Sequence, residues 1–323
     1  MTRQLGLFAP EPVASIEVDQ ATRALARALP PWLYFGTSSW TFPGWKGIVY
    51  GGSPTQDDLT KTGLAAYAAH PLLRTVGVDR SYYGPLNARD LEAYAAQLPP
   101  GFQAVSKIWD EITTFVFPSH PRFGDRAGQR NPRFLDPDLT LQVLAPYTGS
   151  FAPFAGPFVF ELSPAQSAAI GDGRAHLAAI ERLLPALPTQ FRYGFELRNR
   201  ELLTPRYLSV LRAHGAAHVL NMWTAMPTVG AQLAMPGVIT ASFVVARLML
   251  PPRTRYEQLK SAYAPFDRIV FPQPDMRGDV VRLSRACEAA SADLFVVANN
   301  KAEGSAPLTV FALAQAIAEA RAK

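Results

Sequence analysis

The sequence is poor in cysteine and has no long apolar runs. Cys287 is the one cysteine among 323 residues, so no disulfide can form within the chain, and its amphipathic helical surroundings predict a buried position. No stretch of about 18 apolar residues predicts a membrane helix, and the N-terminus lacks the apolar centre of a signal peptide. We therefore expect a cytoplasmic protein that does not associate with membranes.

Histidine is also scarce, with five residues in the chain. His218 begins a predicted strand at the end opposite to the expected site, and the others fall mostly in predicted helices or loops. Zinc sites need several nitrogen, sulfur or carboxylate ligands at one place. We therefore expect no metal and no cofactor.

The formal net charge of the chain is modest, at +5, and its pI is near 9.4. This balance permits an anionic partner without requiring one. The segment 121–134 interleaves four arginines with glycine, proline and phenylalanine. Such a composition fits a loop that contacts phosphates and equally a solvated surface loop.

Apolar runs with strand character alternate with amphipathic helical patterns along most of the chain. The predicted strands begin at Trp32 and then cover 73–78, 102–107, 157–162, 191–197, 217–220, 242–248 and 294–298. Eight strands that alternate with helices predict an α/β fold, a single TIM-like (β/α)8 barrel, over residues 31–323. Residues 1–30 form an N-terminal extension whose helix, from Asp19 to Leu29, is expected to cap the bottom of the barrel. A long loop, 115–137, follows the third strand.

Several short motifs lie at or near these strands. They are Gly36-Thr37-Ser38-Ser39-Trp40, Asp79-Arg80-Ser81-Tyr82-Tyr83, Gly101-Phe102 with Lys107, Glu196-Leu197-Arg198, and Asn299-Asn300 followed by Ala306-Pro307. Together they resemble the YecE-like family, the domain of unknown function 72, which consists of TIM barrels without established activity. The resemblance implies the fold and names no reaction.

The chain departs from the family pattern at several of these strand ends. Gly77 replaces a usual glutamate, and Thr114 and Asn199 replace histidines. Met249-Leu250 replaces His-Gly, and Glu161 stands where the family tends to have glutamine. These changes remove potential metal ligands and add one carboxylate.

The strand ends gather polar side chains at the C-terminal face, where TIM barrels carry their sites. The expected ligand-binding residues are Lys107, Arg198, Arg247, Asn299, Asn300, Tyr83 and Trp40, with Tyr82 and Trp45 nearby. Three cations predict an anionic ligand, either a phosphorylated sugar, a nucleotide or a DNA end. Tyr82 and Tyr83 can stack on a sugar or base, or pack on the protein.

Two glutamates provide an alternative function. Strand alternation places Glu196 and Arg198 on one face, where they form either a ligand clamp or a structural ion pair. Glu161 and Glu196 on neighbouring strands are candidate catalytic residues of a carbohydrate hydrolase or isomerase. Arginines close to both would keep them ionised rather than raise the pKa of one of them.

The N-terminal extension carries a short apolar motif, Gln4-Leu5-Gly6-Leu7-Phe8. It resembles the Gln-Leu-x-Leu-Phe peptide with which bacterial replication and repair proteins bind the DNA sliding clamp. Gln4, Leu5, Leu7 and Phe8 are therefore candidate partner-binding residues. The alternative is a short apolar tail that folds back on the barrel. The sequence predicts no oligomeric state.

Overall fold

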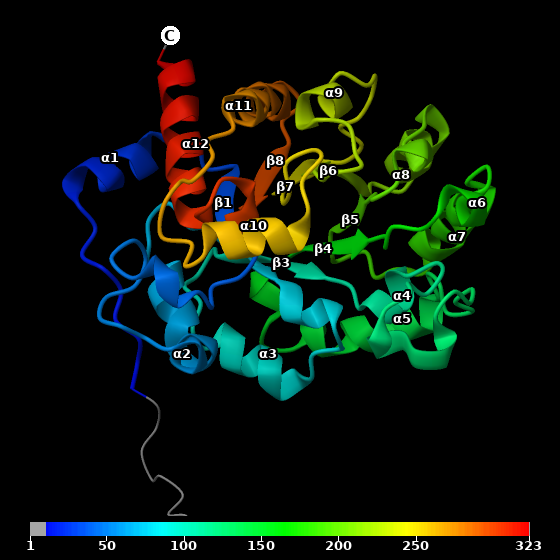
Figure 1. Ribbon diagram of the computed structural model, residues 1–323. Helices are drawn as coiled ribbons and strands as arrows, with labels where there is room; N and C mark the ends of the chain where they lie inside the picture. The colour runs from blue at the N-terminus through cyan, green and yellow to red at the C-terminus, as the bar shows by residue number, and fades with distance from the viewer. Residues whose placement is uncertain (1–10, 323) are drawn as a thin grey trace, which may run out of the picture.

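Eight short parallel strands pair in chain order and close on themselves, β1 with β8, in the computed structural model, which describes residues 11–322 (Figure 1). The strands are β1 Leu33–Thr37, β2 Thr75–Val78, β3 Gln103–Lys107, β4 Ala155–Glu161, β5 Tyr193–Glu196, β6 Ala217–Met222, β7 Phe243–Leu248 and β8 Asp293–Ala298. The predicted TIM-like barrel is confirmed. Each predicted strand agrees with an observed one to within a few residues.

Helices surround the barrel and follow the strands in the expected alternation. They are α1 Gln20–Ala28, α2 Gln56–Ala68, α3 Ala88–Ala95, α4 Asp110–Thr113, α5 Pro137–Leu144, α6 Ser167–Ile170, α7 Arg174–Leu183, α8 Pro205–Ala213, α9 Val229–Leu233, α10 Tyr256–Tyr263, α11 Pro274–Ala289 and α12 Ala306–Arg321. Cys287 of α11 is fully buried, as predicted, and burial raises the pKa of its thiol to about 12. No helix within residues 11–322 is long and apolar enough to cross a membrane.

The barrel interior is filled by branched and aromatic side chains. Val105, Val159, Val219, Val245 and Val297 belong to one buried cluster that the strands enclose. Towards the N-terminal ends of the strands, Tyr34 stacks on Phe295 at 4.5 Å between ring centres. Arg192 donates to Asp293 at 3.1 Å and to Gln103 at 2.7 Å at the same end. The interior is thus packed, and the opposite end is left for a site.

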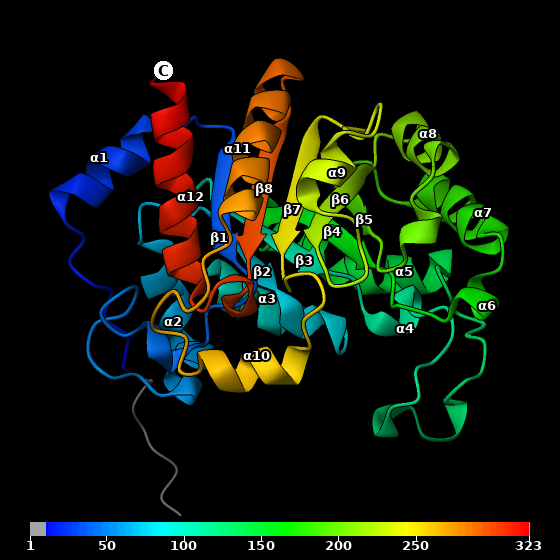
Figure 2. The same cartoon turned by 45° about the horizontal axis from the view of Figure 1, so that its top comes forward.

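The N-terminal helix is present at the predicted place but not in the predicted position. Helix α1 lies beside α12, which separates it from the barrel (Figures 1 and 2). None of its residues is buried. It therefore packs beside α12 in the outer layer and does not cap the bottom of the barrel.

The long segment after β3 projects from the barrel as a hairpin-like loop. Val116 and Arg130 form an antiparallel bridge at its base, and a 3-10 helix, η3 Pro121–Arg126, lies at its tip. Figure 2 shows the loop and helix α10 at the end of the barrel to which the strand arrows point. Both elements therefore border the C-terminal mouth.

Gly36 lies where β1 packs closely against β2, and a substitution at this position tests that packing. A Cβ atom at this position would lie 1.9 Å from the carbonyl oxygen of Thr75. We expect Gly36→Ala to lower the free energy of unfolding by about 3 kcal/mol or more, because the backbone of two paired strands must separate. Urea unfolding measures this change. Gly84→Ala is the matched control, since no atom lies within 4 Å of its added Cβ, and it should change stability by less than about 0.5 kcal/mol. Equal stability of both variants would contradict the strand register.

Candidate active site

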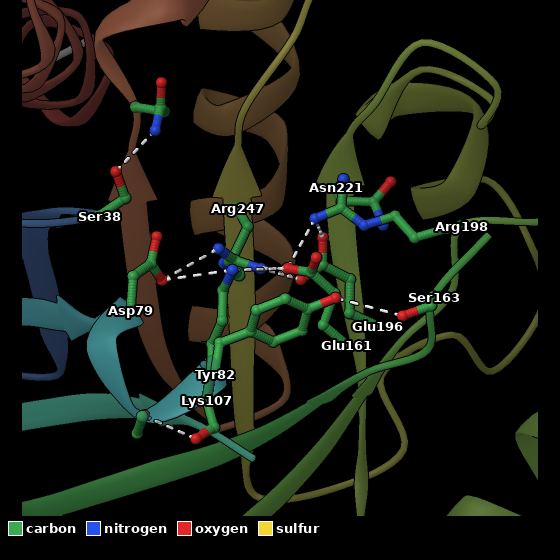
Figure 3. Close-up of polar contacts among 12 residues, drawn as sticks. Ser38, Asp79, Tyr82, Lys107, Glu161, Ser163, Glu196, Arg198, Asn221 and Arg247 are labelled. Carbon is green, nitrogen blue, oxygen red and sulfur yellow. Dashed lines mark hydrogen bonds and ion pairs between the residues drawn. The ribbon is translucent and has the colours of Figure 1, made fainter. Parts of the chain in front are cut away.

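Six charged side chains meet at the C-terminal ends of the strands (Figure 3). They are Asp79 after β2, Lys107 at the end of β3, Glu161 at the end of β4, Glu196 at the end of β5, Arg198 just beyond it and Arg247 on β7. In a barrel, alternate side chains of each strand point inwards, so residues from distant parts of the chain converge here. Five of these six were predicted from the sequence, and the structure brings those five together.

One carboxylate oxygen lies at the centre of this cluster. Glu161 Oε2 is 3.0 Å from Lys107 Nζ and 2.8 Å from Arg198 Nη2, and it also accepts a hydrogen bond from Arg247 Nη1. Three cations therefore contact a single oxygen atom. The Glu161 side chain keeps 13% of its surface exposed, less than the 28% of Asp79.

Glu196 lies deeper and contacts the same two arginines. Its side chain is fully buried, with Oε1 at 2.7 Å from Arg198 Nη2 and Oε2 bonded to Arg247 Nη1. Asp79 adds longer contacts, 3.4 Å to Lys107 Nζ and 3.5 Å to Arg247 Nη2. Three carboxylates thus balance three cations. The sequence interpretation counted only two carboxylates here and expected an excess of positive charge that these six residues do not have.

The cluster keeps its acids ionised. Burial alone would raise the pKa of Glu161, but Arg198, Lys107 and Arg247 outweigh it and hold this pKa well below its usual range. Burial likewise opposes the charge of Arg247, yet Glu196, Glu161 and Asp79 raise its pKa. Glu161 is therefore suited to accept hydrogen bonds and not to donate a proton.

Arg198 has donors that its carboxylate contacts do not use. Its Nε and Nη1 atoms are buried without a hydrogen-bond partner among the described residues. Its guanidinium lies over the face of the Trp223 ring, 3.9 Å from the ring centre, and this cation–π contact stabilises the positive charge. The side chain is 2% exposed, so both the ring and the carboxylates fix its orientation.

Aromatic rings border the charged cluster on several sides. Lys107 Nζ lies 4.5 Å from the centre of the Tyr82 ring, and the Tyr82 hydroxyl lies 3.2 Å from Ser163 Oγ. Tyr83 and Tyr256 are 71% and 48% exposed, which makes them the most accessible of these rings. Tyr82 is therefore fixed within the protein, while Tyr83 and Tyr256 have free surface for a ligand.

Three predicted ligand-binding residues use their side chains inside the protein instead. The Trp40 indole donates to Leu59 O at 3.0 Å, and the residue is 4% exposed. Asn299 Nδ2 donates to Ser38 Oγ at 2.8 Å. Asn300 Oδ1 accepts from Trp45 Nε1 at 3.1 Å and from Ala306 N at 2.8 Å. Trp40 thus packs in the core and the two asparagines lie in the turn after β8, where Asn300 Nδ2 is buried without a hydrogen-bond partner among the described residues.

That turn presents a cation that the sequence interpretation did not consider. Lys301 lies in the 3-10 turn η8 Asn300–Ala302 and is 5% exposed. Its Nζ atom lies 3.9 Å from the centre of the Tyr256 ring. The Asn-Asn motif marked the place of this turn, but only the fold shows that Lys301 is the residue it positions.

The arginines of the 121–134 segment mostly bind the loop to the barrel. Arg122 pairs with Asp110, and Arg126 pairs with Glu111 at 2.8 Å. Arg130 lies 4.4 Å from the centre of the Phe115 ring. These contacts favour the surface-loop interpretation for three of the four arginines.

The remaining sequence predictions concern metals and the clamp motif. Residues 11–322 contain no group of three or more His, Cys, Asp or Glu side chains arranged to hold a metal ion. Buried His70, His176 and His218 each have a pKa lowered by burial to about 4. Gln4, Leu5, Leu7 and Phe8 lie outside the described residues.

Comparison with known proteins identifies relatives but no activity. A family model described as "Protein of unknown function DUF72" matches residues 34–323. A DUF72 family protein from Enterococcus faecalis V583 has a similar fold, with a TM-score of 0.61 and 15% identity over 88% of this chain and 95% of that one. Another, from Thermotoga maritima MSB8, gives a TM-score of 0.55 and 18% identity over 90% and 99% of the two chains. None of the curated proteins matches.

The depressed pKa of Glu161 predicts a pH dependence of stability. Its ordinary value is 4.5. Below that pH the unfolded chain binds a proton that the folded protein does not, so the stabilisation present above pH 4.5 is lost as the pH falls further. In Glu161→Gln this slope should be shallower by up to about 1.4 kcal/mol per pH unit. Denaturant unfolding between neutral pH and pH about 3 measures it.

A surface variant separates this effect from general acid unfolding. Glu181 forms an exposed ion pair with Arg206 at 2.7 Å. Glu181→Gln should keep the slope of the unchanged protein, because exposed pairs contribute little. A Glu161→Gln variant with the same slope would show that the three cations do not stabilise the ionised carboxylate.

Proposed function

The chain belongs to the DUF72 family, whose description names no function, and we propose from the geometry of the barrel mouth that it binds a phosphorylated ligand. Sugar phosphates, nucleotides and phosphorylated DNA ends share the chemical group concerned. The anion would bind to Lys107, Arg198 and Arg247. The observation that carries this proposal is the contact of all three cations with one oxygen atom, Glu161 Oε2.

Glu161 occupies the position that a ligand oxygen would take. Paired guanidinium donors and an ammonium group are the usual partners of phosphate oxygens. Glu161 and Glu196 are the carboxylates that contact both arginines, and Glu161 is 13% exposed whereas Glu196 is fully buried, so Glu161 is the one of this pair that can turn towards solvent. We infer that a bound phosphate displaces Glu161, while Glu196 and Asp79 remain as counter-charges.

The exposed rings support a ligand with a flat or cyclic part. Tyr83 packs edge to face on Tyr82, whose ring lies 4.5 Å from Lys107 Nζ, and the Tyr256 ring lies 3.9 Å from Lys301 Nζ. Aromatic faces pack well on sugar rings and nucleobases. These rings therefore favour a phosphorylated sugar or nucleotide over a bare anion.

The hydrolase or isomerase alternative has weaker support. A glycosidase needs one carboxyl group with a raised pKa, whereas the pKa of Glu161 is held well below its usual range. Arg247 Nη1 also contacts both Glu161 and Glu196 and lies between their carboxylates. That guanidinium nitrogen occupies the space where a scissile bond would have to lie.

Recruitment to replication or repair sites is a second proposal, and it rests on the sequence motif alone. Gln4, Leu5, Leu7 and Phe8 match the clamp-binding peptide pattern. The described chain starts at the surface, where Thr62 Oγ1 donates to Glu11 O at 3.2 Å.

Removing the internal carboxylate tests the anion site. We expect Glu161→Gln to bind inorganic phosphate at least about ten-fold more tightly than the unchanged protein, because no protein carboxylate competes with the ligand for the three cations. Calorimetric titration measures the affinity. Ribose 5-phosphate and a 5′-phosphorylated oligonucleotide, each beside its unphosphorylated form, would then separate small ligands from DNA ends.

Two further variants are controls for this experiment. Glu181→Gln changes the net charge equally at the surface and should not alter the phosphate affinity. Arg198→Ala added to Glu161→Gln should remove the gain, because it removes one of the three cations. Equal phosphate affinity with and without Glu161 would contradict the proposed site.

The clamp proposal is tested with the full-length protein and the sliding clamp. We expect Leu7→Ala with Phe8→Ala to weaken binding at least about ten-fold, because apolar anchors carry most of the binding energy of such peptides. Gly6→Ala, at the variable position of the motif, is the matched control and should keep the affinity. Absence of clamp binding by the unchanged protein would end the proposal.

A further inference from the structure

We propose that Lys301 is a carbonyl-reactive amine that forms an imine with an aldehyde or ketone carbon of the bound ligand. The reactivity of this amine is inferred from the residues around Lys301 and does not depend on the phosphate site. The identity of its substrate, a phosphorylated carbonyl compound such as an open-chain sugar phosphate, rests on the phosphate site proposed above. The fold, the surroundings of Lys301 and the chemistry of its side chain each contribute to the inference.

The backbone of Lys301 is held in place by the residues before it. Its N–H donates to Asn299 Oδ1 at 3.0 Å, and Asn300 is fixed through Trp45 and Ala306 N. Asn299 is in turn bonded to Ser38 at the end of β1. A lysine on such a turn, directly after β8, is presented at the C-terminal face with little backbone freedom.

The surroundings of its ammonium group differ from those of Lys107. Lys107 forms ion pairs with Glu161 and Asp79. Lys301 has no carboxylate within 4.0 Å and no hydrogen-bond acceptor for Nζ anywhere in residues 11–322, although it is 5% exposed. Its neighbour is the face of the Tyr256 ring, 3.9 Å from Nζ. Within the described chain, no carboxylate forms an ion pair with this ammonium group, and the Tyr256 ring face is the contact that favours its charged form.

These surroundings favour the neutral amine. Burial, and then the cation of Lys260 on α10, lower the pKa of Lys301 to about 8, against the opposing effects of Glu257 on α10 and Asp79 after β2. An ordinary lysine has a pKa near about 10.4. The neutral form, which is the nucleophile, is therefore far more populated at neutral pH than in exposed lysines.

The step balances without any further reactant. The lone pair of Nζ attacks the carbonyl carbon and gives a carbinolamine. Loss of water then breaks the carbon–oxygen bond, and the nitrogen forms the double bond to carbon. The oxygen leaves as water with two protons, and no electron is transferred. The imine can be reduced by borohydride, which makes it detectable.

The chain is favourable for this test because it has only six lysines beside 25 arginines. Full-length protein would be treated with pyridoxal 5′-phosphate, a phosphorylated aldehyde, and then with borohydride, and the labelled lysines identified by peptide mapping. We expect Lys301 to be labelled at least ten-fold faster than exposed Lys46 and Lys61 at neutral pH. Its rate should rise to half its maximum near pH 8. Slower labelling of Lys301 than of these exposed lysines would overturn the proposal.

Further variants define what the label reports. Lys301→Arg keeps a cation and should lose the label while the protein stays folded. Tyr256→Ala removes the ring that covers Nζ and hydrates the amine, so the pH of half-maximal labelling should rise above about 8 towards the value of an exposed lysine. An unchanged pattern of labelled peptides in Lys301→Arg would contradict the assignment.

Two comparisons keep this inference separate from the proposed function. If pyridoxal, which lacks the phosphate, labels Lys301 as fast as pyridoxal 5′-phosphate, and excess inorganic phosphate does not protect it, the reactive amine stands and the phosphate site fails. If inorganic phosphate binds as proposed but neither aldehyde labels Lys301, the phosphate site stands and the reactive amine is wrong.

Discussion

The mouth of this barrel depends on the neutralisation of three buried cations. Arg198 and Arg247 are each 2% exposed, and Lys107 is 10% exposed, so none of them is well hydrated. An isolated buried charge costs several kcal/mol, and removal of one partner of a buried pair is costly. Strands β4 and β5 and the turn after β2 supply the required carboxylates. The geometry of the site is therefore set by charge balance as much as by the barrel.

A balanced cluster can still select for anions. A neutral ligand that displaced Glu161 would leave the cations with too little compensation, whereas a phosphate would replace one negative group by another. Glu196 cannot exchange in this way, because it is fully buried beneath the same arginines. Selectivity would thus come from Glu161, the more exposed of the two carboxylates that contact both arginines. The net charge of the whole protein contributes little to it.

The sequence predicts the barrel well because its signals are local and repeated. Apolar runs that alternate with amphipathic stretches place all eight strands, and the strand ends identify Lys107, Glu161, Glu196, Arg198 and Arg247. Residues in turns are different, because a motif fixes their place along the chain but not their partners. Asn299 and Asn300 bond to Ser38 and Trp45, which are far away in the sequence and become neighbours only when β8 pairs with β1 and the barrel closes. For the same reason the roles of Asp79 and Lys301 in the mouth could not be predicted.

The choice between lysine and arginine also carries information about the mouth. Arginine supplies most of the positive charge of this chain, and its guanidinium stays protonated at every physiological pH. Arg198 and Arg247 are such permanently charged side chains, and they balance the charge of the carboxylates in the cluster. Lysine is the cation that can become a neutral nucleophile when it is buried. The chain has few lysines, yet one of them, Lys301, lies buried at the mouth where no carboxylate of the described residues pairs with it. An arginine would serve a purely electrostatic role at that position as well or better, so the presence of lysine favours a role in which the charge is lost.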